Sequence, residues 1–376
     1  MKFIILKKNL KNGLRAIERI SGDNTAIPIL KNFLIESVDN KIKLSATNLE
    51  LAVTSFISGK IIENGSLTIP LNIFNSIINN IQNEKINLEA DNNKLLIKTD
   101  NYQATIQGIK KEEFPIIPKI ENTKNYLEIP SLILKESLLS IIDSLGPEIR
   151  PELNGVLFDF QTTALKLAAT DSFRLSEKTI FNTQFKSTFD KNFKTIIPNK
   201  TIQEIIKEPQ INESAETEKF FIYFDPNQIF LKSENIEIIS RLINGDFPDY
   251  SQIIPQNTEI ELILNREELI NAVKLTGIFT DRLNEIKIFI KDNGKSIEAS
   301  SANQGLGENK YLIPAKIKGN IKNSFEVSFN WRYLLDGIKN IKSEEVLLGL
   351  NNSNKPCLIK SPGEISWFYV LMPIKS

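Results

Sequence analysis

KFIILKKNLKNGLRAIERI, residues 2–20, is the first of three segments with one pattern, and this pattern is the main sequence evidence for the fold. The other two segments are YLEIPSLILKESLLSIIDSL at 126–145 and EIELILNREELINAVKLTGIF at 259–279. Each copy begins with the alternation of apolar and polar residues that is typical of a strand, and continues with the spacing of an amphipathic helix. Asn265, followed three residues later by Glu268, predicts a helix start in the third copy. One strand-to-helix junction is commonplace, but three in one chain indicate an internal repeat.

Three further features recur in the same order. A strand ends in a small polar cluster, a strand stops where a helix begins, and a late strand leads to a proline. Their anchors are Asn48, Asp171 and Asn303, then Pro70, Pro198 and Asn330, then Pro115, Pro248 and Pro373. Within each set the spacings are between 123 and 133 residues. Proline suits the first turn of a helix, because the N–H that it lacks has no partner there.

The repeat predicts an α+β chain of three tandem domains at residues 1–123, 124–256 and 257–376, each with strands on both sides of two helices. Domains of one design that associate head to tail close into a ring when the rotation per domain divides a full turn. Two chains would supply six domains, with helices lining a central hole and antiparallel sheets outside. The alternative is a structural repeat protein whose three domains merely stack.

Composition restricts the chemistry. The 376 residues contain no histidine and one cysteine, which excludes a Ser-His-Asp triad, a Cys-His pair and a His-ligated zinc site. An enzyme that works with carboxylates stays open, and its candidates are Asp246 with Asp249, or Asp171 with Arg174. A carboxylate near an arginine is more often a structural ion pair, so we expect no catalysis, no metal and no cofactor.

The chain has no segment of about 18 uncharged apolar residues and no signal-peptide pattern at its start, so we expect a cytoplasmic protein. Lys plus Arg and Asp plus Glu number 46 each, so any nucleic-acid contact must come from local charge. The first predicted helix supplies such charge with Lys7, Lys8, Lys11, Arg15 and Arg19 against Glu18. These side chains could bind phosphates, or they could only solvate a helix face.

Several motifs, collinear over essentially the whole chain, resemble the family of bacterial DNA sliding clamps, the β subunits of DNA polymerase III. They are IPIL at 27–30, RPELNGVLF at 150–158, TDSFRL at 170–175, GDFPDY at 245–250 and YVLMPI at 369–374. The resemblance implies the DNA-clamp fold and a homodimeric ring around duplex DNA, bound without sequence specificity. It implies a clamp loader and the catalytic subunit of the replicative polymerase as partners, and no membrane partner.

The resemblance further implies a cleft for short Gln- and Leu/Phe-containing peptides of the polymerase and of other replication and repair proteins. Its residues would be Leu153, Thr170, Ser172, Phe173, Arg174, Leu175, Pro248, Tyr333, Pro356, Val370, Leu371, Met372, Pro373 and Ile374. Met372 and the aliphatic side chains would form an adaptable apolar floor, and Arg174 would orient polar groups of the peptide.

For DNA, the resemblance together with the helix charge indicates Lys7, Lys11, Arg15, Arg150, Lys200 and Arg282. The chain departs from the family at the subunit interface. Gln304, Gly305, Leu306 and Gly307 replace acidic residues that similar clamps pair with basic ones. We therefore expect ring closure through apolar contact, from Tyr102, Ala104 and Ile106 to Ile278 and Phe279.

Overall fold

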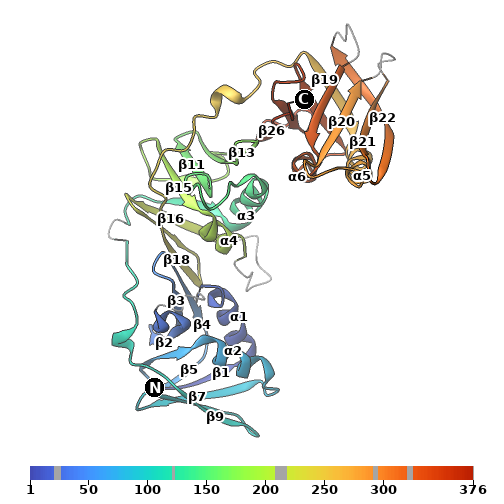
Figure 1. The fold of residues 1–376 in the computed structure, drawn as a ribbon. Coiled ribbons are helices and arrows are strands. Elements are labelled where there is room, and N and C mark those ends of the chain that lie inside the picture. The colour runs from blue at the N-terminus through green and yellow to red at the C-terminus, as the bar shows by residue number, and fades with distance from the viewer. Residues whose placement is uncertain (21–26, 121–122, 208–217, 291–294, 320–324, 376) are drawn as a thin grey trace. The chain divides into compact units, whose positions relative to one another are not determined.

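The computed structural model describes residues 1–20, 27–120, 123–207, 218–290, 295–319 and 325–375 (Figure 1). Contacts group the chain into two compact units. The first unit contains residues 1–136, 182–191 and 197–243, and the second contains residues 137–181, 192–196 and 244–376. No helix among the described residues is both long enough and apolar enough to cross a membrane.

The strands of the first unit are β1 (Lys2–Leu6), β2 (Asn32–Val38), β3 (Lys41–Thr47), β4 (Leu51–Ile57), β5 (Lys60–Glu63), β6 (Ser66–Pro70), β7 (Lys85–Asp91), β8 (Lys94–Lys98), β9 (Gln103–Gln107), β10 (Leu127–Pro130), β14 (Lys186–Ser187), β16 (Lys219–Asp225), β17 (Gln228–Lys232) and β18 (Ile236–Arg241). One antiparallel sheet has the order β5-β1-β7-β8-β9. The other runs β14-β10-β16-β17-β18-β4-β3-β2-β6.

The strands of the second unit, with β15 at its boundary, are β11 (Gly155–Gln161), β12 (Ala164–Thr170), β13 (Arg174–Phe181), β15 (Phe193–Pro198), β19 (Ile260–Asn265), β20 (Glu285–Ile290), β21 (Ser296–Asn303), β22 (Gly307–Gly319), β23 (Phe325–Asn330), β24 (Glu345–Leu350), β25 (Cys357–Lys360) and β26 (Trp367–Leu371). They form one sheet in the order β15-β11-β12-β13-β26-β25-β24-β19-β22-β21-β20-β23.

The α-helices are α1 (Lys7–Ile17), α2 (Leu71–Asn80), α3 (Ser131–Leu139), α4 (Asn199–Lys207), α5 (Arg266–Gly277) and α6 (Trp331–Lys339). Short 3-10 turns occur at Pro28–Lys31, Lys111–Glu113, Ile142–Ser144 and Ser251–Ile253. Helix α1 packs against α2 and β4, and α5 packs against α6 (Figure 1).

The helices predicted from the sequence are confirmed in all three copies of the repeat, where α1, α3 and α5 follow β1, β10 and β19. Leu10, Leu14 and Ile17 form the buried stripe of α1. The Asn265 side chain accepts the Glu268 amide at 3.0 Å and caps α5. The prolines lie one residue earlier than predicted: Pro70 ends β6 and α2 begins at Leu71. Pro70 has the extended backbone of a residue that precedes a helix, with φ −57° and ψ 115°, so its ring does not enter the helical turn.

Each repeat has the same element order: a strand, a helix, three strands, a short pairing segment, a strand, a helix and three strands. The short segment is β5 beside β1 in the first copy and β14 beside β10 in the second. In the third copy the last residues of the long strand β22, Ala315–Gly319, take that place beside β19. The predicted α+β fold with three tandem copies is confirmed. The boundaries at 123/124 and 256/257 stay predictions.

Two antiparallel ladders join consecutive copies. Strand β18 pairs with β4 inside the first unit, with Ile238 opposite Val53. Strand β26 pairs with β13 inside the second unit, with Tyr369 opposite Ser176. In both ladders the last strand of one copy pairs with the strand that closes the first three-stranded run of the copy before it. Sheet hydrogen bonding therefore continues across both domain borders.

Candidate functional site

The turn between β12 and β13 is held by its own side chains. The Thr170 hydroxyl donates to the Arg174 carbonyl at 2.7 Å and accepts the Ser172 amide at 3.2 Å. One carboxylate oxygen of Asp171 accepts the amides of Phe173 and Arg174, each at 2.9 Å. Ser172 has a left-handed backbone with φ 78°. This fixed turn presents the Phe173 ring to solvent, with 61% of it exposed.

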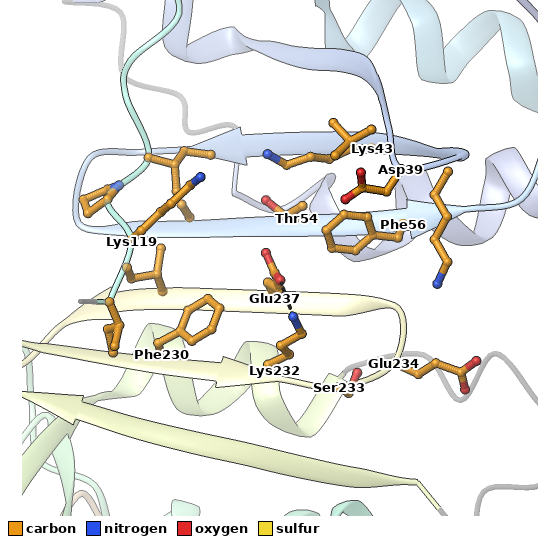
Figure 2. Close-up of a pocket in the computed structure, with 17 residues that line it drawn as sticks. Asp39, Lys43, Thr54, Phe56, Lys119, Phe230, Lys232, Ser233, Glu234 and Glu237 are labelled. Atoms are coloured by element: carbon orange, nitrogen blue, oxygen red, sulfur yellow. Dashed lines mark ion pairs between the residues drawn. The ribbon is translucent and has the colours of Figure 1, made fainter. Parts of the chain in front are cut away.

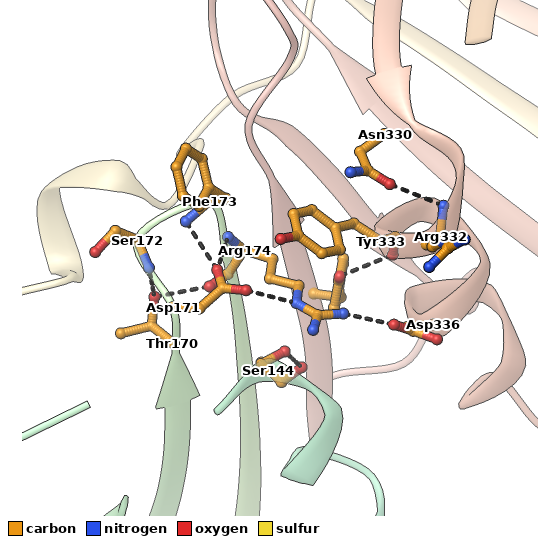
Figure 3. A network of polar contacts seen from close by, with 12 residues as sticks. Ser144, Thr170, Asp171, Ser172, Phe173, Arg174, Asn330, Arg332, Tyr333 and Asp336 are labelled. Carbon is orange, nitrogen blue, oxygen red and sulfur yellow. Dashed lines mark hydrogen bonds and ion pairs between the residues drawn. The ribbon is translucent and has the colours of Figure 1, made fainter. Parts of the chain in front are cut away.

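The Arg174 side chain joins this turn to α6, as Figure 3 shows. Its Nε donates to Asp171 at 2.9 Å and one Nη donates to Asp336 at 2.6 Å. The guanidinium also lies 4.2 Å from the centre of the Tyr333 ring, a cation–π contact. Burial by itself lowers the pKa of Arg174, but Tyr369, Asp336 and Asp171 together raise it above its usual value.

The end of the chain follows the same turn. The Met372 amide donates to the Phe173 carbonyl at 2.8 Å, and the Ile374 amide donates to the Ser328 carbonyl at 2.9 Å. The Tyr369 hydroxyl donates to the Tyr333 carbonyl at 2.8 Å. These bonds fasten the chain end to both the β12–β13 turn and the third domain.

The predicted cleft residues divide by exposure into a framework and an accessible set. Leu153, Thr170, Leu175, Val370, Leu371 and Pro373 are buried. Ser172, Phe173 and Pro248 are exposed, and Arg174, Tyr333, Pro356, Met372 and Ile374 are partly exposed. The contacts above connect Thr170, Ser172, Phe173, Arg174, Met372 and Tyr333. Binding of a peptide by any of the fourteen stays a prediction.

The corresponding turn at the first junction has the same scaffold and different chemistry. The Thr47 hydroxyl donates to the Leu51 carbonyl and accepts the Leu49 amide, and Asn48 accepts the amides of Glu50 and Leu51. Leu49 has φ 77°. In the aligned repeats, however, Leu51 replaces Arg174 and Arg241 replaces Met372. The chain therefore carries the arginine network and the apolar chain end at one junction and not at the other, which makes the second junction the candidate site.

Comparison with known families covers nearly the whole chain. Residues 1–118 match the model of the DNA polymerase III beta subunit, N-terminal domain, residues 140–249 match its central domain, and residues 251–375 match its C-terminal domain. The chain belongs to the DNA polymerase III beta subunit family. The resemblance read from the sequence motifs is thereby confirmed.

Relatives in this family match over full length. The beta sliding clamp of Chlamydia pneumoniae is 27% identical over 379 residues, covering 100% of this chain and 99% of that protein. The crystal structure of the Bacillus subtilis DNA polymerase sliding clamp has a TM-score of 0.91 at 25% identity, covering 100% of this chain and 99% of that one. A Bartonella birtlesii clamp, solved bound to griselimycin, has a TM-score of 0.89 at 25% identity, covering 100% of both chains.

The residues predicted for DNA contact, from the helix charge and from the resemblance, lie in several environments. Lys7 in α1 donates to the Ile81 carbonyl, so its amine already has a protein partner. Arg15 is exposed and Lys11 partly exposed on the same helix. Lys200 is exposed in the first turn of α4, and Arg282 is exposed in the turn after α5. The role of these residues toward DNA stays a prediction.

Arg150 differs from the other predicted DNA contacts, because it is linked to the candidate cleft. Its Nη1 donates to the Ser172 hydroxyl at 3.1 Å, and its Nε donates to Glu152 at 3.4 Å. The side chain is half exposed. This contact could not be predicted from the sequence, since the two residues are 22 positions apart.

Residues suggested for the subunit interface lie beside strand edges. Strand β9 ends the five-stranded sheet, with Tyr102 exposed just before it, Ala104 partly exposed and Ile106 buried within it. In the second unit, an added Cβ on Gly307, at the start of β22, would lie 3.7 Å from Phe279, and 61% of Ile278 is exposed. Leu306 and Leu312 are exposed on or next to β22, and the predicted set did not include them.

Two other residues were not predicted as part of the site. Asp336 and Tyr369 hold Arg174 and Tyr333 in place. In the sequence, Asp336 is only a charged residue of a predicted helix, and Tyr369 is only an aromatic residue of a predicted strand.

Of the carboxylates considered for an enzyme, Asp171 is paired with Arg174 and caps the turn. Asp249 accepts the amide and hydroxyl of Ser251 at 3.1 and 2.6 Å. Both carboxylates therefore stabilise turns.

Proposed function

We propose that this protein is a DNA sliding clamp. Two copies form a ring around duplex DNA in the cytoplasm, and the ring tethers the replicative polymerase and other proteins. Family membership over residues 1–118, 140–249 and 251–375 supports this function. A closed ring turns re-association of the polymerase into a local event, so processivity needs no tight grip on DNA.

One observation supports ring closure. Two strand pairs, β18 with β4 and β26 with β13, already join consecutive copies, and the equivalent third pair consists of two strands with open edges. In the repeat, β9 corresponds to β18 and β26, while the first residues of β22 correspond to β4 and β13. Residues Gly307–Pro314 pair with β21 on one side, and no ladder among the described residues covers their other side. Exposed strand edges are templates for the addition of another strand. Because the equivalent edges are paired at the two other junctions, these two edges predict pairing between one chain and a second chain.

The two joined ladders also predict the register of the third. When β9 is aligned on β18 and β22 is aligned on β4 and β13, Ala104 lies opposite Asn309 and Ile106 opposite Gly307 of the second copy. Ile278, Leu306 and Leu312 are exposed beside this edge and supply apolar area. This register supports closure through apolar contact and backbone hydrogen bonds, without an acidic cluster.

The second junction would then be the docking cleft for partner peptides. Phe173, Met372 and Pro248 offer accessible apolar surface next to backbone groups held by the Asp171 and Arg174 network. Such a surface suits short peptides with apolar anchors. In this function the clamp loader opens the ring, and the protein itself performs no catalysis and needs no cofactor.

The deciding experiment compares a closed circular plasmid with the same plasmid after linearisation. A ring held by topology stays on the circle after loading and leaves the linear form by sliding off its ends. Gel filtration at moderate salt should separate the two cases, with a clear excess of protein on the circle. Equal retention on both forms would show adhesion and would favour the stacked repeat protein.

A further inference from the structure

A second pocket lies on the sheet of the first unit, away from the candidate cleft. Its volume is about 530 Å³, its floor is the outward side of β3, β4, β17 and β18, and one wall is the linker segment 117–120. Figure 2 shows the two pairs of strands with the linker passing over them at one end. The clamp function proposed above does not involve this pocket.

The floor has rows of different character. Ala52, Ile239 and Phe230 are neighbours across β4, β18 and β17, and they form an apolar row. The next row is polar, with Thr54 opposite Glu237 and Glu237 opposite Lys232. An aromatic side chain that enters over the apolar row would contact apolar residues while its edge faces polar groups.

The two ends of the pocket differ in charge. In Figure 2, Lys119 and Phe230 lie toward one end, and Asp39 and Glu234 lie toward the other. Lys43 is paired with Glu36 at 3.1 Å and Lys232 with Glu237 at 3.3 Å. In the part of the chain that the structure describes, Lys119 has no ion-pair partner, and it is exposed. The linker end therefore has a cation available for an anionic group.

The second repeat has an aromatic side chain at the position that a ligand would take in this pocket. The second linker, FPDYS at 247–251, aligns with FPIIP at 114–118, so Tyr250 corresponds to Ile117. The Tyr250 hydroxyl donates at 2.6 Å to Glu177, and Glu177 corresponds to Thr54 on the floor of the pocket. The second linker thus covers this part of the sheet with the side chain of Tyr250. The first linker has the shorter Ile117 at the equivalent position, and the pocket is open there.

We propose that this pocket, between the first linker and the β4–β18 junction, binds a short acidic peptide segment of a partner protein through one aromatic side chain. The aromatic ring lies on Ala52, Ile239 and Phe230 with its polar edge toward Thr54, whose counterpart Glu177 accepts the Tyr250 hydroxyl in the second repeat. An adjacent carboxylate pairs with Lys119. This site is separate from the cleft formed by Phe173 and Met372, so one clamp subunit could hold two different peptides.

The probe is the peptide acetyl-Glu-Glu-Tyr-Glu-Glu-amide, followed by NMR of the labelled isoleucine methyl groups of the full-length protein. We expect saturable shifts of the Ile117 and Ile239 signals. Lys119→Glu should weaken binding at least about tenfold, the effect of roughly 1.4 kcal/mol from a reversed charge. Ile117→Tyr, which copies the second repeat, should abolish the Ile239 shift. Lys98→Glu, an exposed change on β8 outside the pocket, is the matched control and should leave the affinity unchanged.

Three results would overturn the proposal: no shift with millimolar peptide, equal binding of the peptide with Lys in place of Glu, or unchanged binding by Ile117→Tyr. Thermal unfolding establishes that each variant is folded. The double variant Met372→Ala with Pro373→Ala should bind this probe normally. If it does not, the probe occupies the cleft and the second site is wrong, while the clamp function is unaffected.

Discussion

Arg174 shows how one residue can organise a binding surface without being its most exposed part. Its guanidinium is paired with Asp171 and Asp336 and stacked on Tyr333, and only 12% of the side chain is exposed. The planar guanidinium donates to Asp171 from Nε and to Asp336 from one Nη in a fixed geometry, whereas a lysine ammonium is a compact point charge without this fork. We therefore infer that Arg174 positions the turn, and that Phe173 and Met372 supply the accessible apolar contact.

Replacing Arg174 by Lys tests this role. We expect Arg174→Lys to lower the free energy of unfolding of the second unit by about 2 kcal/mol, because a partly buried carboxylate loses its hydrogen bond. Arg241→Lys is the matched control, since Arg241 and Glu50 form an exposed pair at 3.4 Å. Urea unfolding should show a change below about 0.5 kcal/mol for the control. Equal effects of the two changes would contradict the positioning role.

Glu36 is a second residue with an identifiable energetic role. It is buried in β2 and pairs with Lys43 and with Lys111 of the 3-10 turn Lys111–Glu113. Burial by itself raises the pKa of Glu36, but the hydrogen bonds from Lys111 and Lys43 outweigh it and lower the pKa below the usual 4.5. The charged form is therefore favoured by folding. Its contribution is complete above pH 4.5 and is lost as the pH falls through the lowered value.

We expect Glu36→Gln to destabilise the first unit by about 1–2 kcal/mol at pH 7, a modest figure because Lys111 is half exposed. The difference from the parent protein should shrink as the pH falls through the lowered pKa of Glu36, where the parent also loses the charge. Urea unfolding between pH 3 and 7 measures both. Glu89→Gln, which removes an exposed pair with Lys2, should have little effect at any pH. A difference that grows toward low pH would refute the assignment.

At the scale of elements, the same turn and ladder occur at both junctions, and only the side chains differ. The turns after β3 and β12 share their Thr and Asn or Asp hydrogen bonds, and each supports a ladder to the following repeat. The scaffold is therefore a property of the repeat, whereas the binding surface depends on a few residues placed on one copy of it.

The chain end beyond β26 gives the clearest test of the cleft. Met372→Ala with Pro373→Ala should weaken binding of a Gln- and Leu/Phe-containing peptide about 30-fold, or roughly 2 kcal/mol, because Met372 loses apolar contact with the peptide and the buried Pro373 no longer packs to hold the chain end in place. Fluorescence anisotropy with a labelled peptide measures the affinity. Ile365→Ala removes an exposed aliphatic side chain elsewhere in the same unit and should leave it unchanged. An unchanged affinity in the folded double variant would remove the cleft assignment.

At the scale of the whole molecule, the proposed ring depends on edges that are open in the single chain. Closure uses two symmetric interfaces, so any change at the edge counts twice per ring. Apolar side chains beside an open edge are a hazard for a protein that works alone, but they suit one that pairs with a copy of itself.

Ile278→Asp should break the dimer and leave the chain folded, because 61% of this side chain is exposed in the single chain. Burying an unpaired carboxylate at each of two interfaces costs about 2 kcal/mol apiece, or roughly a thousandfold in the dimer dissociation constant. Sedimentation velocity measures the dissociation. Ile365→Asp, at a side chain with 79% exposure outside the proposed interface, is the control and should stay dimeric. A dimer that tolerates Ile278→Asp would place the interface elsewhere.

Much of the fold could be predicted because its signals are local. The strand alternation in residues 2–6, the stripe Leu10, Leu14 and Ile17, and the cap at Asn265 depend on neighbours a few positions away. Repetition at near-equal spacing then gave three copies of one domain. The cleft residues, by contrast, came from resemblance to a family, since an apolar YVLMPI taken by itself favours a core strand over a binding surface.

The helices, the strands, their threefold repetition and the exclusion of histidine chemistry all follow from the order of residues, because each of these depends on residue type and short spacing. Tertiary structure decided which residues meet across long separations: Arg174 with Asp336, Arg150 with Ser172, and Glu36 with Lys111. It also decided which edges stay open and which repeat leaves a pocket over its sheet. These features depend on packing between distant segments, and no local pattern of residues encodes them.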